Sequence, residues 1–197
     1  MDAATVELYE HRADEWVQRR GMATDGLGRH FRDEVGAGLV ADLGCGPGRY
    51  LAEIGGQLVG VDATAAMLRL ARGSGYPLIR ADLEALPFAD GSLAGAFARH
   101  SYLHLPKDRL AAALSDVRRA LRPGGKLLMT LIEGAYEGHH LAGDDFSGRY
   151  FALWSAPELA ELLDAARFSD VRIERLARRR EGGQEAQPRS GRAHFVW

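Results

Sequence analysis

The 197-residue sequence contains one cysteine, little net charge and no long hydrophobic stretch. The single cysteine, Cys45, excludes an internal disulfide and is typical of a reducing compartment. No apolar stretch approaches the ~20 residues that a helix needs to cross a membrane, and the acidic N-terminal segment is unlike a signal peptide. A formal net charge of −2 gives the whole chain no strong attraction to nucleic acid. We therefore expect a cytoplasmic protein with a single domain over residues 1–197, a monomer or homodimer, without a membrane or nucleic-acid partner.

Two glycine-rich nucleotide motifs are also absent. The glycines at positions 44, 46 and 48 have the spacing G-x-G-x-G, and the G-x-G-x-x-G spacing of dinucleotide sites does not occur there. No G-x-x-x-x-G-K-[ST] segment is present either. The sequence therefore disfavours a nicotinamide-dependent enzyme and a P-loop nucleotidase.

The G-x-G-x-G segment follows a short apolar run, Val40–Leu43, which carries an acid at Asp42. Glycines permit positive φ angles and let a ligand approach the backbone closely. A helix that starts after such a turn presents unpaired N–H groups, which suit a carboxylate or a phosphate. The pattern predicts a strand, a ligand-binding turn and a helix, with Asp42 able to accept hydrogen bonds from a cationic amine. Cys45, inside the turn, fits a small packing residue better than a catalytic thiol.

Two further apolar runs end at acids, Asp62 and Asp82. Asp62 follows Asp42 by 62 − 42 = 20 residues, the distance to the end of the next parallel strand. In an open parallel sheet the carboxyl ends of the strands meet at one edge, where ligands bind, and an acid on the second strand commonly holds a ribose. Any one acid could simply cap a helix, as Asp62 could near Thr64, but capping does not explain all three.

Apolar runs alternate with helix-length amphipathic segments along the chain. The expected strands lie near residues 38–43, 57–61, 76–81, 93–99, 125–132, 169–176 and 192–197. The expected helices lie near 48–54, 64–72, 107–121 and 156–166, and residues 1–36 are expected to form an N-terminal helical lid. The polar segment 178–192 is expected to form a hairpin loop. This alternation predicts an α/β fold with helices on both faces of the sheet.

Four segments together resemble the class I S-adenosylmethionine-dependent methyltransferases with a D-L-G-C-G-x-G signature. They are Asp42–Gly48, Gly60–Asp62, Asp82–Phe88 and Leu121–Lys126. The resemblance covers most of the chain and implies a Rossmann-like, doubly wound sheet of seven strands, mostly parallel with an antiparallel last strand. It also implies S-adenosylmethionine as cofactor and S-adenosylhomocysteine as product. Family members usually carry an aromatic–aspartate pair where this chain has Leu93-Ala94; because that aspartate is often structural, we still expect activity.

The resemblance also implies where the cofactor binds. It places the methionine part beside the glycine turn, the ribose on Asp62, and the adenine beside Asp82 and Leu83. The backbone of Arg99 would lie beside the sulfonium, and Tyr9, on an N-terminal helix, would cover the cofactor. The expected cofactor-binding residues are Tyr9, Asp42, Gly44, Cys45, Gly46, Asp62, Ala63, Met67, Asp82, Leu83 and Arg99.

The methyl acceptor is expected between the segment after the fourth strand and an insertion over residues 133–154. This insertion mixes aromatic and titratable residues, as pockets for functionalised small molecules do, although an ordinary surface loop is the alternative. The expected acceptor-binding residues are His100, Tyr136, His139, Arg149, Tyr150 and Trp154. His104 and His140 are candidate bases, and packing is an equal alternative for His104. His100 and His104 have the i, i+4 spacing of metal ligands, but no glutamate or third ligand accompanies them, so we expect no metal site.

The leading hypothesis is therefore a methyltransferase that acts on an oxygen or nitrogen of a small molecule. Residues 148–154 also resemble a stretch of enzymes that methylate a carboxylate on wobble uridines of tRNA, which gives a second hypothesis. A third is a partner protein that binds S-adenosylmethionine but has lost catalysis.

Overall fold

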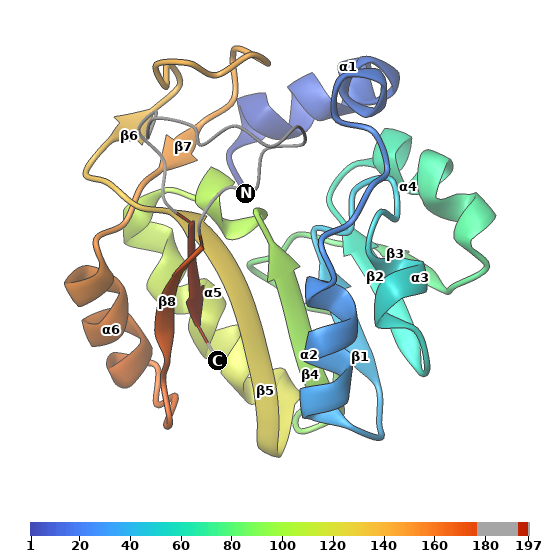
Figure 1. Cartoon of the computed structure of the whole chain (residues 1–197). Helices are drawn as coiled ribbons and strands as arrows, with labels where there is room; N and C mark the ends of the chain where they lie inside the picture. Colours follow the sequence, from blue (N-terminus) through green and yellow to red (C-terminus); the bar gives the residue numbers. More distant parts are fainter. Residues whose placement is uncertain (177–192, 197) are drawn as a thin grey trace, which may run out of the picture.

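A twisted sheet forms the centre of the computed structural model, which describes residues 1–176 and 193–196 (Figure 1). Its strands are β1 (Val40–Leu43), β2 (Leu58–Asp62), β3 (Leu78–Arg80), β4 (Leu93–Arg99), β5 (Leu121–Ile132), β8 (Ile173–Leu176) and β9 (Ala193–Val196). They form a seven-stranded sheet in the order β3-β2-β1-β4-β5-β9-β8. The first five strands pair in parallel, and β9 is antiparallel to both of its neighbours. The predicted doubly wound α/β class is confirmed, and the strand order reverses between β1 and β4.

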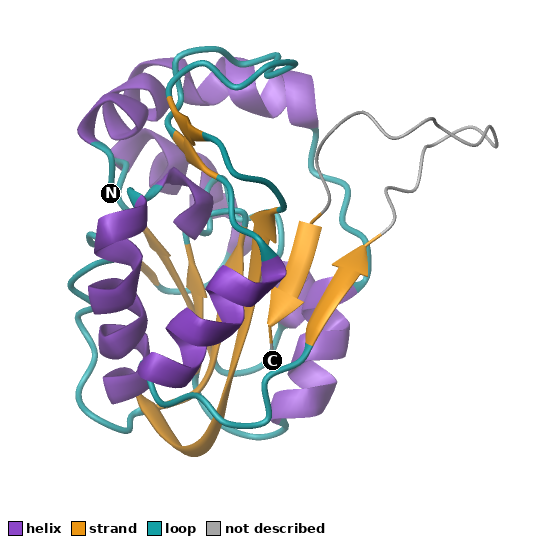
Figure 2. Cartoon of the chain, turned by 90° about the vertical axis from the view of Figure 1, so that its left-hand side faces the viewer, coloured by secondary structure: helices purple, strands orange, loops and turns teal. Residues whose placement is uncertain are grey.

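Helices cover both faces of this sheet (Figure 2). They are α1 (Ala3–Arg20), α2 (Leu27–Val35), α3 (Leu51–Ile54), α4 (Ala65–Ala71), α5 (Lys107–Ala120) and α6 (Ala156–Ala165), with 3-10 turns η1 (Arg72–Ser74) and η2 (Tyr102–His104). The larger apolar core lies between the sheet and α5 and α6, and a smaller one packs beneath α2, α3 and α4. None of the helices within the described residues is both long and apolar enough to cross a bilayer.

β4 carries a small residue where α2 crosses it. A Cβ at Gly95 would lie 2.8 Å from Cγ2 of Val35 and 2.9 Å from Cζ of Phe31. The rings of Phe31 and Phe97 are fully buried with their centroids 5.6 Å apart, and burial of each contributes about 2–3 kcal/mol. This fit holds α2 flat against the sheet. Within residues 1–36, which were expected to form a lid, α2 therefore packs on the face of the sheet, and only α1 lies at the carboxyl ends of the strands.

α1 crosses above the carboxyl ends of the strands (Figure 1). Its first turn is capped by Asp2, whose Oδ1 accepts a hydrogen bond from the Thr5 amide at 2.8 Å. Glu10 accepts a hydrogen bond from the Ala66 amide at 3.3 Å, which ties α1 to the start of α4. The insertion after β5 forms the short antiparallel pair β6 (Glu137–Gly138) and β7 (Phe151–Ala152) and lies at the same end of the molecule. α1 and this insertion together form a roof over the carboxyl edge.

Four elements have boundaries that differ clearly from the sequence prediction. α3 begins at Leu51 and not near residue 48, because Gly48 has φ +85° and the chain is still turning there. β5 begins at Leu121 and not near residue 125, because Leu121 pairs with Leu93 across a register shift and Gly124 (φ +72°) absorbs the irregularity. β3 and β8 are shorter than predicted. The hairpin loop expected over 178–192 lies outside the described residues.

Arg32 of α2 joins two turns on the amino side of the sheet, one between α2 and β1 and one between α3 and β2. Its guanidinium donates only to backbone carbonyl groups, at 2.7–3.3 Å. The acceptors are the carbonyls of Ile54, Gly36, Gly38, Gly55 and Gln57. One side chain thereby satisfies carbonyl groups at the ends of α2 and α3 and before β1 and β2.

Candidate functional site

The candidate site lies at the reversal of strand order, where open α/β sheets bind ligands. Asp42 and Asp62 lie at or next to the ends of β1 and β2, and Asp82 follows β3 by two residues. The strands are parallel and in register, with Asp42 opposite Gly60 and Asp62 opposite Arg80. The structure therefore brings the three predicted acids to one edge of the sheet.

The glycine turn is shaped by its neighbours. The amides of Gly44 and Cys45 both donate to the Val61 carbonyl, at 2.8 and 2.9 Å, so the turn is fastened to β2. Gly44 has φ +78°, and a Cβ there would lie only 2.3 Å from Cβ of Ser101. A Cβ at Gly46 would meet nothing within 4 Å, although its φ is +54°. Gly46 thus presents open backbone for a ligand, whereas Gly44 is required for packing.

Replacing Gly44 with alanine should lower the free energy of unfolding by about 2 kcal/mol, because the new Cβ meets Ser101 and the positive φ disfavours an L side chain. Gly73 provides the matched control, since a Cβ there meets nothing within 4 Å and its φ is not positive. Urea denaturation of Gly44→Ala and Gly73→Ala measures the difference. Equal stability of the two variants would contradict the packing argument.

Asp42 and Ser101 each carry a buried oxygen without a hydrogen-bond partner among the described residues. Asp42 is 2% exposed and Ser101 is 5% exposed, and the orphaned atoms are Oδ2 and Oγ. Burial, with a smaller contribution from the charge of Asp62, raises the pKa of Asp42 to about 8. Orphaned buried acceptors are uncommon and usually mark a missing ligand or water. The two atoms fit a cationic hydrogen-bond donor such as the ammonium group of S-adenosylmethionine. Sequence reasoning missed Ser101, because no motif includes it.

The raised pKa of Asp42 makes a prediction for stability. The folded protein holds the Asp42 proton up to pH 8, whereas the unfolded chain releases it near the ordinary value of 3.8. Between these values the native state binds more protons, so stability should fall as pH rises, by about 3–4 kcal/mol between pH 5 and pH 8. Asp42→Asn should remove this part of the decline. Denaturation curves at both pH values test it, and an identical pH dependence in the variant would be incompatible with a protonated Asp42.

Asp62 braces the glycine turn from the neighbouring strand. Its Oδ2 accepts from the Gly46 amide at 2.8 Å, and Oδ1 accepts from the amide and hydroxyl of Thr64 at 2.9 and 2.8 Å. Burial raises the pKa of Asp62 even though these hydrogen bonds favour the carboxylate. Asp62 therefore shapes the turn in addition to its expected place beside a ribose.

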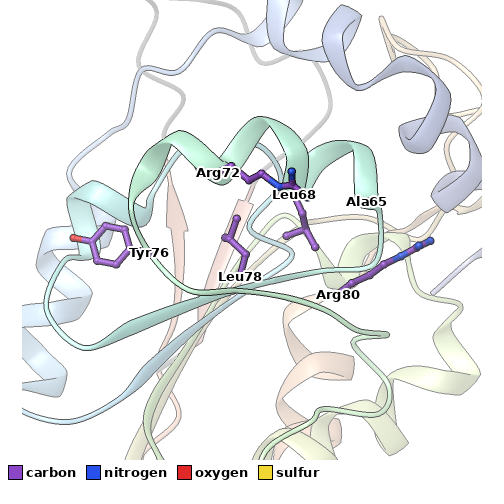
Figure 3. A pocket seen from close by; sticks show the side chains of 6 residues that line it. All are labelled: Ala65, Leu68, Arg72, Tyr76, Leu78 and Arg80. Atoms are coloured by element: carbon purple, nitrogen blue, oxygen red, sulfur yellow. The ribbon is translucent and has the colours of Figure 1, made fainter.

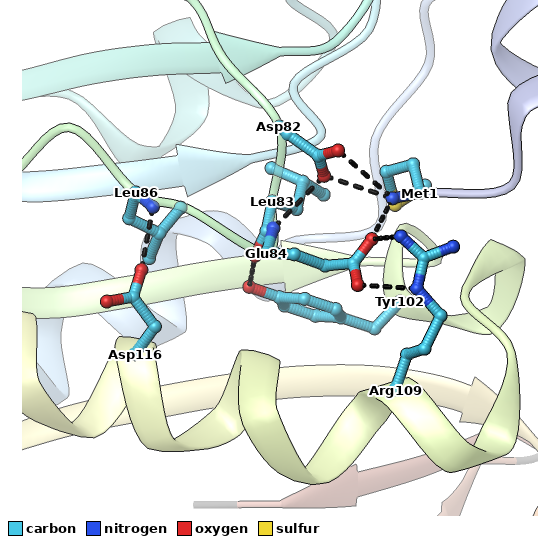
Figure 4. Close-up of polar contacts among 8 residues, drawn as sticks. All are labelled: Met1, Asp82, Leu83, Glu84, Leu86, Tyr102, Arg109 and Asp116. Atoms are coloured by element: carbon cyan, nitrogen blue, oxygen red, sulfur yellow. Dashed lines mark hydrogen bonds and ion pairs between the residues drawn. The ribbon is translucent and has the colours of Figure 1, made fainter.

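The segment from Asp82 forms a wall of the site (Figure 4). The Asp82 side chain is 51% exposed and contacts the Met1 amino group at 3.0 Å, and Met1 also pairs with Glu84. Leu83 is buried, and its carbonyl accepts from the Tyr102 hydroxyl at 3.1 Å. Further along, the Leu86 amide donates to Asp116 of α5 at 2.6 Å. The expected adenine wall is thus held rigidly by η2 and α5.

The other expected cofactor residues differ in how they face the site. Cys45 is buried and burial raises the pKa of its thiol, so the structure favours the packing role over a catalytic thiol. Met67 is a buried residue of α4, and the Ala63 carbonyl accepts from Arg80 at 3.1 Å. Only the backbone of Arg99 lies at the end of β4 as expected. Its guanidinium turns to an ion pair with Asp25 and hydrogen bonds with Tyr50 and Thr130.

His100 and His104 do not share a helical face, contrary to the spacing argument. His100 ends β4 with φ +55°, a left-handed conformation, and His104 lies in the separate 3-10 turn η2. His104 is 4% exposed; its Nε2 lies 3.1 Å from the Tyr9 hydroxyl and its Nδ1 lies 2.6 Å from the Tyr150 carbonyl. Burial lowers the pKa of His104 to about 3. The structure therefore favours the packing role for His104 over the role of a base.

The insertion divides its expected residues into exposed and buried groups. His140 is exposed, and its amide donates to the Tyr136 hydroxyl at 2.7 Å. The His139 and Tyr150 rings pack edge to face with centroids 5.1 Å apart. Trp154 is buried in the larger core, with Lys107 above its ring at 4.7 Å, so it packs against the sheet. Arg149, also buried, is paired with Asp144.

A separate hollow of about 370 Å³ lies between α4 and the edge strand β3 (Figure 3). It is lined by Ala65, Leu68, Arg72, Tyr76, Leu78 and Arg80. None of the predicted site residues lines it, so it does not mark the predicted site.

Part of the chain is similar in sequence to known methyltransferases. Residues 40–125, which contain the glycine turn and the acids of β1–β3, match a family described as "Methyltransferase domain". "Probable tRNA methyltransferase 9B" of Mus musculus is 29% identical over 140 residues, which are 66% of this chain and 31% of that protein. The malonyl-[acyl-carrier protein] O-methyltransferase of Pseudescherichia vulneris is 32% identical over 65% of this chain and 53% of its own. The chain thus spans about a third to a half of these curated relatives.

A solved structure extends the likeness to nearly the whole chain. The 1,6-didemethyltoxoflavin-N1-methyltransferase of Burkholderia thailandensis, with bound 1,6-didemethyltoxoflavin and S-adenosylhomocysteine, superposes with a TM-score of 0.69. It is 25% identical and the match covers 97% of this chain and 82% of that chain.

Proposed function

We propose that this chain, which belongs to the class I S-adenosylmethionine-dependent methyltransferase family, transfers a methyl group to an oxygen or nitrogen atom of a small molecule. The bound cofactor supplies a methyl group on a sulfonium, which is a good leaving group. The protein's contribution is then to hold the nucleophile in line with that methyl group and to exclude water.

One observation supports the cofactor placement most directly. The orphaned oxygens of Asp42 and Ser101 lie beside a turn whose Gly46 is open to a ligand. An ammonium group donates hydrogen bonds and carries positive charge, so it satisfies both oxygens and favours the ionised form of Asp42. We place the methionine part of the cofactor there, the ribose next to Asp62, and the adenine against Asp82 and Leu83.

The acceptor is proposed to bind under the roof, between His100 and the insertion 133–154. His139, His140, Tyr136 and Tyr150 are polar or aromatic side chains of this insertion that are at least partly exposed. One similar protein is named for N-methylation of 1,6-didemethyltoxoflavin, which supports a small-molecule acceptor. Another is named for O-methylation of malonyl-[acyl-carrier protein], which supports transfer to oxygen.

Two measurements, made one after the other, test the proposal. Calorimetry with S-adenosylhomocysteine tests the cofactor site, and absence of binding would overturn it. Incubation with radiolabelled S-adenosylmethionine and small-molecule extracts, followed by mass identification of the labelled product, tests the transfer. Binding without any labelled product would favour the catalytically inactive partner protein.

Methylation of tRNA is a second candidate, favoured by the relative named "Probable tRNA methyltransferase 9B". The net charge of −2 gives it no support from composition. Steeply salt-dependent binding of tRNA would favour this candidate, and a flat salt response would count against it.

A further inference from the structure

A buried chain of polar groups connects α1, η2 and the insertion. The Arg149 guanidinium donates from Nη1 to the Tyr9 hydroxyl at 3.0 Å, and that hydroxyl lies 3.1 Å from Nε2 of His104. His104 in turn contacts the Tyr150 carbonyl through Nδ1 at 2.6 Å. At the other end Arg149 forms an ion pair with Asp144, and the two side chains are 9% and 5% exposed. Three segments far apart in sequence thus share one polar network.

The direction of each hydrogen bond in this network follows from its chemistry. The Tyr150 carbonyl can only accept, so Nδ1 of His104 carries the proton and Nε2 is left as an acceptor. The Tyr9 hydroxyl therefore donates to Nε2, and its oxygen accepts from the guanidinium, which can only donate. The Tyr9 hydroxyl is held from both sides. Its ring is held by Phe146, which stacks on it at 6.1 Å and 19°.

Each nitrogen of the Arg149 guanidinium donates to a group of the protein itself in this arrangement. Its Nε donates to the Phe146 carbonyl at 3.1 Å, Nη2 pairs with Asp144, and Nη1 serves Tyr9. Its face lies 4.9 Å from the centre of the Phe151 ring. A buried ion pair is poor evidence for stability, because desolvation offsets most of the Coulomb attraction, but it fixes geometry well. Because its nitrogens are engaged by Phe146, Tyr9 and Asp144, the structure favours a positioning role for Arg149 over the expected contact with the acceptor.

Tyr9 lies on α1, which crosses above the carboxyl ends of the strands, where the cofactor crevice is proposed (Figure 1). Its neighbour Glu10 is hydrogen-bonded to Ala66, four residues after Asp62, and the charge of Asp62 contributes to raising the pKa of Tyr9, behind the larger effect of burial. The hydrogen bond from Arg149, which lies on a different segment, therefore helps to fix the Tyr9 hydroxyl at the same end of the sheet as Asp62.

We propose that Arg149 is a positioning residue: it holds Tyr9 over the cofactor crevice and so makes cofactor affinity depend on the acceptor-side insertion. The proposal rests on the proposed function, since it assumes that S-adenosylmethionine binds at the glycine turn. It assigns no contact between Arg149 and the cofactor.

A double-mutant cycle on the full chain tests this, with S-adenosylhomocysteine as the probe in calorimetry. Arg149→Met and Tyr9→Phe should each weaken binding about tenfold, and the double variant should be no weaker than Tyr9→Phe alone. Asp145→Asn is the matched control, because its exposed ion pair with Arg20 joins the same two segments, and it should leave affinity unchanged. Arg149→Lys keeps the charge beside Asp144 and serves if Arg149→Met fails to fold; it should weaken binding too, since a single ammonium cannot reach all three acceptors.

A spectroscopic measurement separates positioning from a general loss of stability. The ¹³Cζ resonance of Tyr9, assigned by its disappearance in Tyr9→Phe, should shift in Arg149→Met and stay in place in Asp145→Asn. Additive losses of affinity, or an unmoved Tyr9 resonance, would overturn the role of Arg149. Failure of the wild-type protein to bind S-adenosylhomocysteine would instead overturn the proposed function.

Discussion

Replacing Asp62 with alanine is expected to weaken S-adenosylhomocysteine binding about 100-fold, which corresponds to about 2.7 kcal/mol. The loss has two physical sources. The Asp62 carboxylate accepts from the Gly46 amide at 2.8 Å and so shapes the turn, and its charge is available to the proposed ribose hydroxyls. Hydrogen bonds to charged groups contribute about 1.5–3 kcal/mol each, so losing the carboxylate removes enough free energy for this effect. Calorimetry on the purified variant measures it.

The matched control for Asp62→Ala is Asp90→Ala. Asp90 is 82% exposed and pairs with Arg119 on the surface, so its removal takes away a carboxylate without touching the crevice. The Asp90→Ala variant should bind S-adenosylhomocysteine with the same affinity as the wild type. An Asp62→Ala variant that binds as tightly as Asp90→Ala would show that the ribose lies elsewhere.

Replacing Arg32 with alanine is expected to lower the free energy of unfolding by about 3 kcal/mol. The substitution leaves five backbone carbonyls without their donor, at a net cost of roughly 0.5–1 kcal/mol each after water replaces part of the bonding. Arg32→Lys should recover only a minor part, because one ammonium cannot reach five carbonyls spread over two turns. Urea denaturation of both variants measures the effect.

Arg29 offers the comparison for Arg32, since it lies exposed on the same helix. Arg29→Ala should change stability by less than about 0.5 kcal/mol. If Arg32→Ala were equally mild, the carbonyl contacts would contribute little and the turns would be held by packing alone.

The fold and the floor of the site could be predicted because their signals are local. Asp42 and Asp62 end buried strands, and the strand spacing alone places them at one edge. The glycines at 44, 46 and 48 predict a turn that requires positive φ angles, and each of the three glycines has a positive φ angle. The seven-stranded topology follows from the alternation of runs and helices, together with the family resemblance.

The predictions that were wrong or incomplete depended on tertiary contacts, which local sequence patterns do not report. The i, i+4 spacing of His100 and His104 suggested a helix, but the left-handed conformation of His100 breaks it, and no local pattern reveals that. The burial of Arg149 depends on Tyr9, 140 residues away in sequence, so its role follows only from tertiary packing. Ser101 became visible only through an orphaned oxygen, which sequence does not report.

The insertion 133–154 leaves and rejoins the sheet at one point. Glu133 bridges to Trp154, and the Trp154 amide donates to the Ile132 carbonyl at 3.1 Å, so the two ends of the segment are fastened together. A loop closed at its base can be exchanged for one of another length at low entropic cost. We expect that replacing this insertion with the corresponding segment of another methyltransferase will change the choice of acceptor and leave the glycine turn and its acids intact. The residue that replaces Arg149 must then be matched to the residue at position 9.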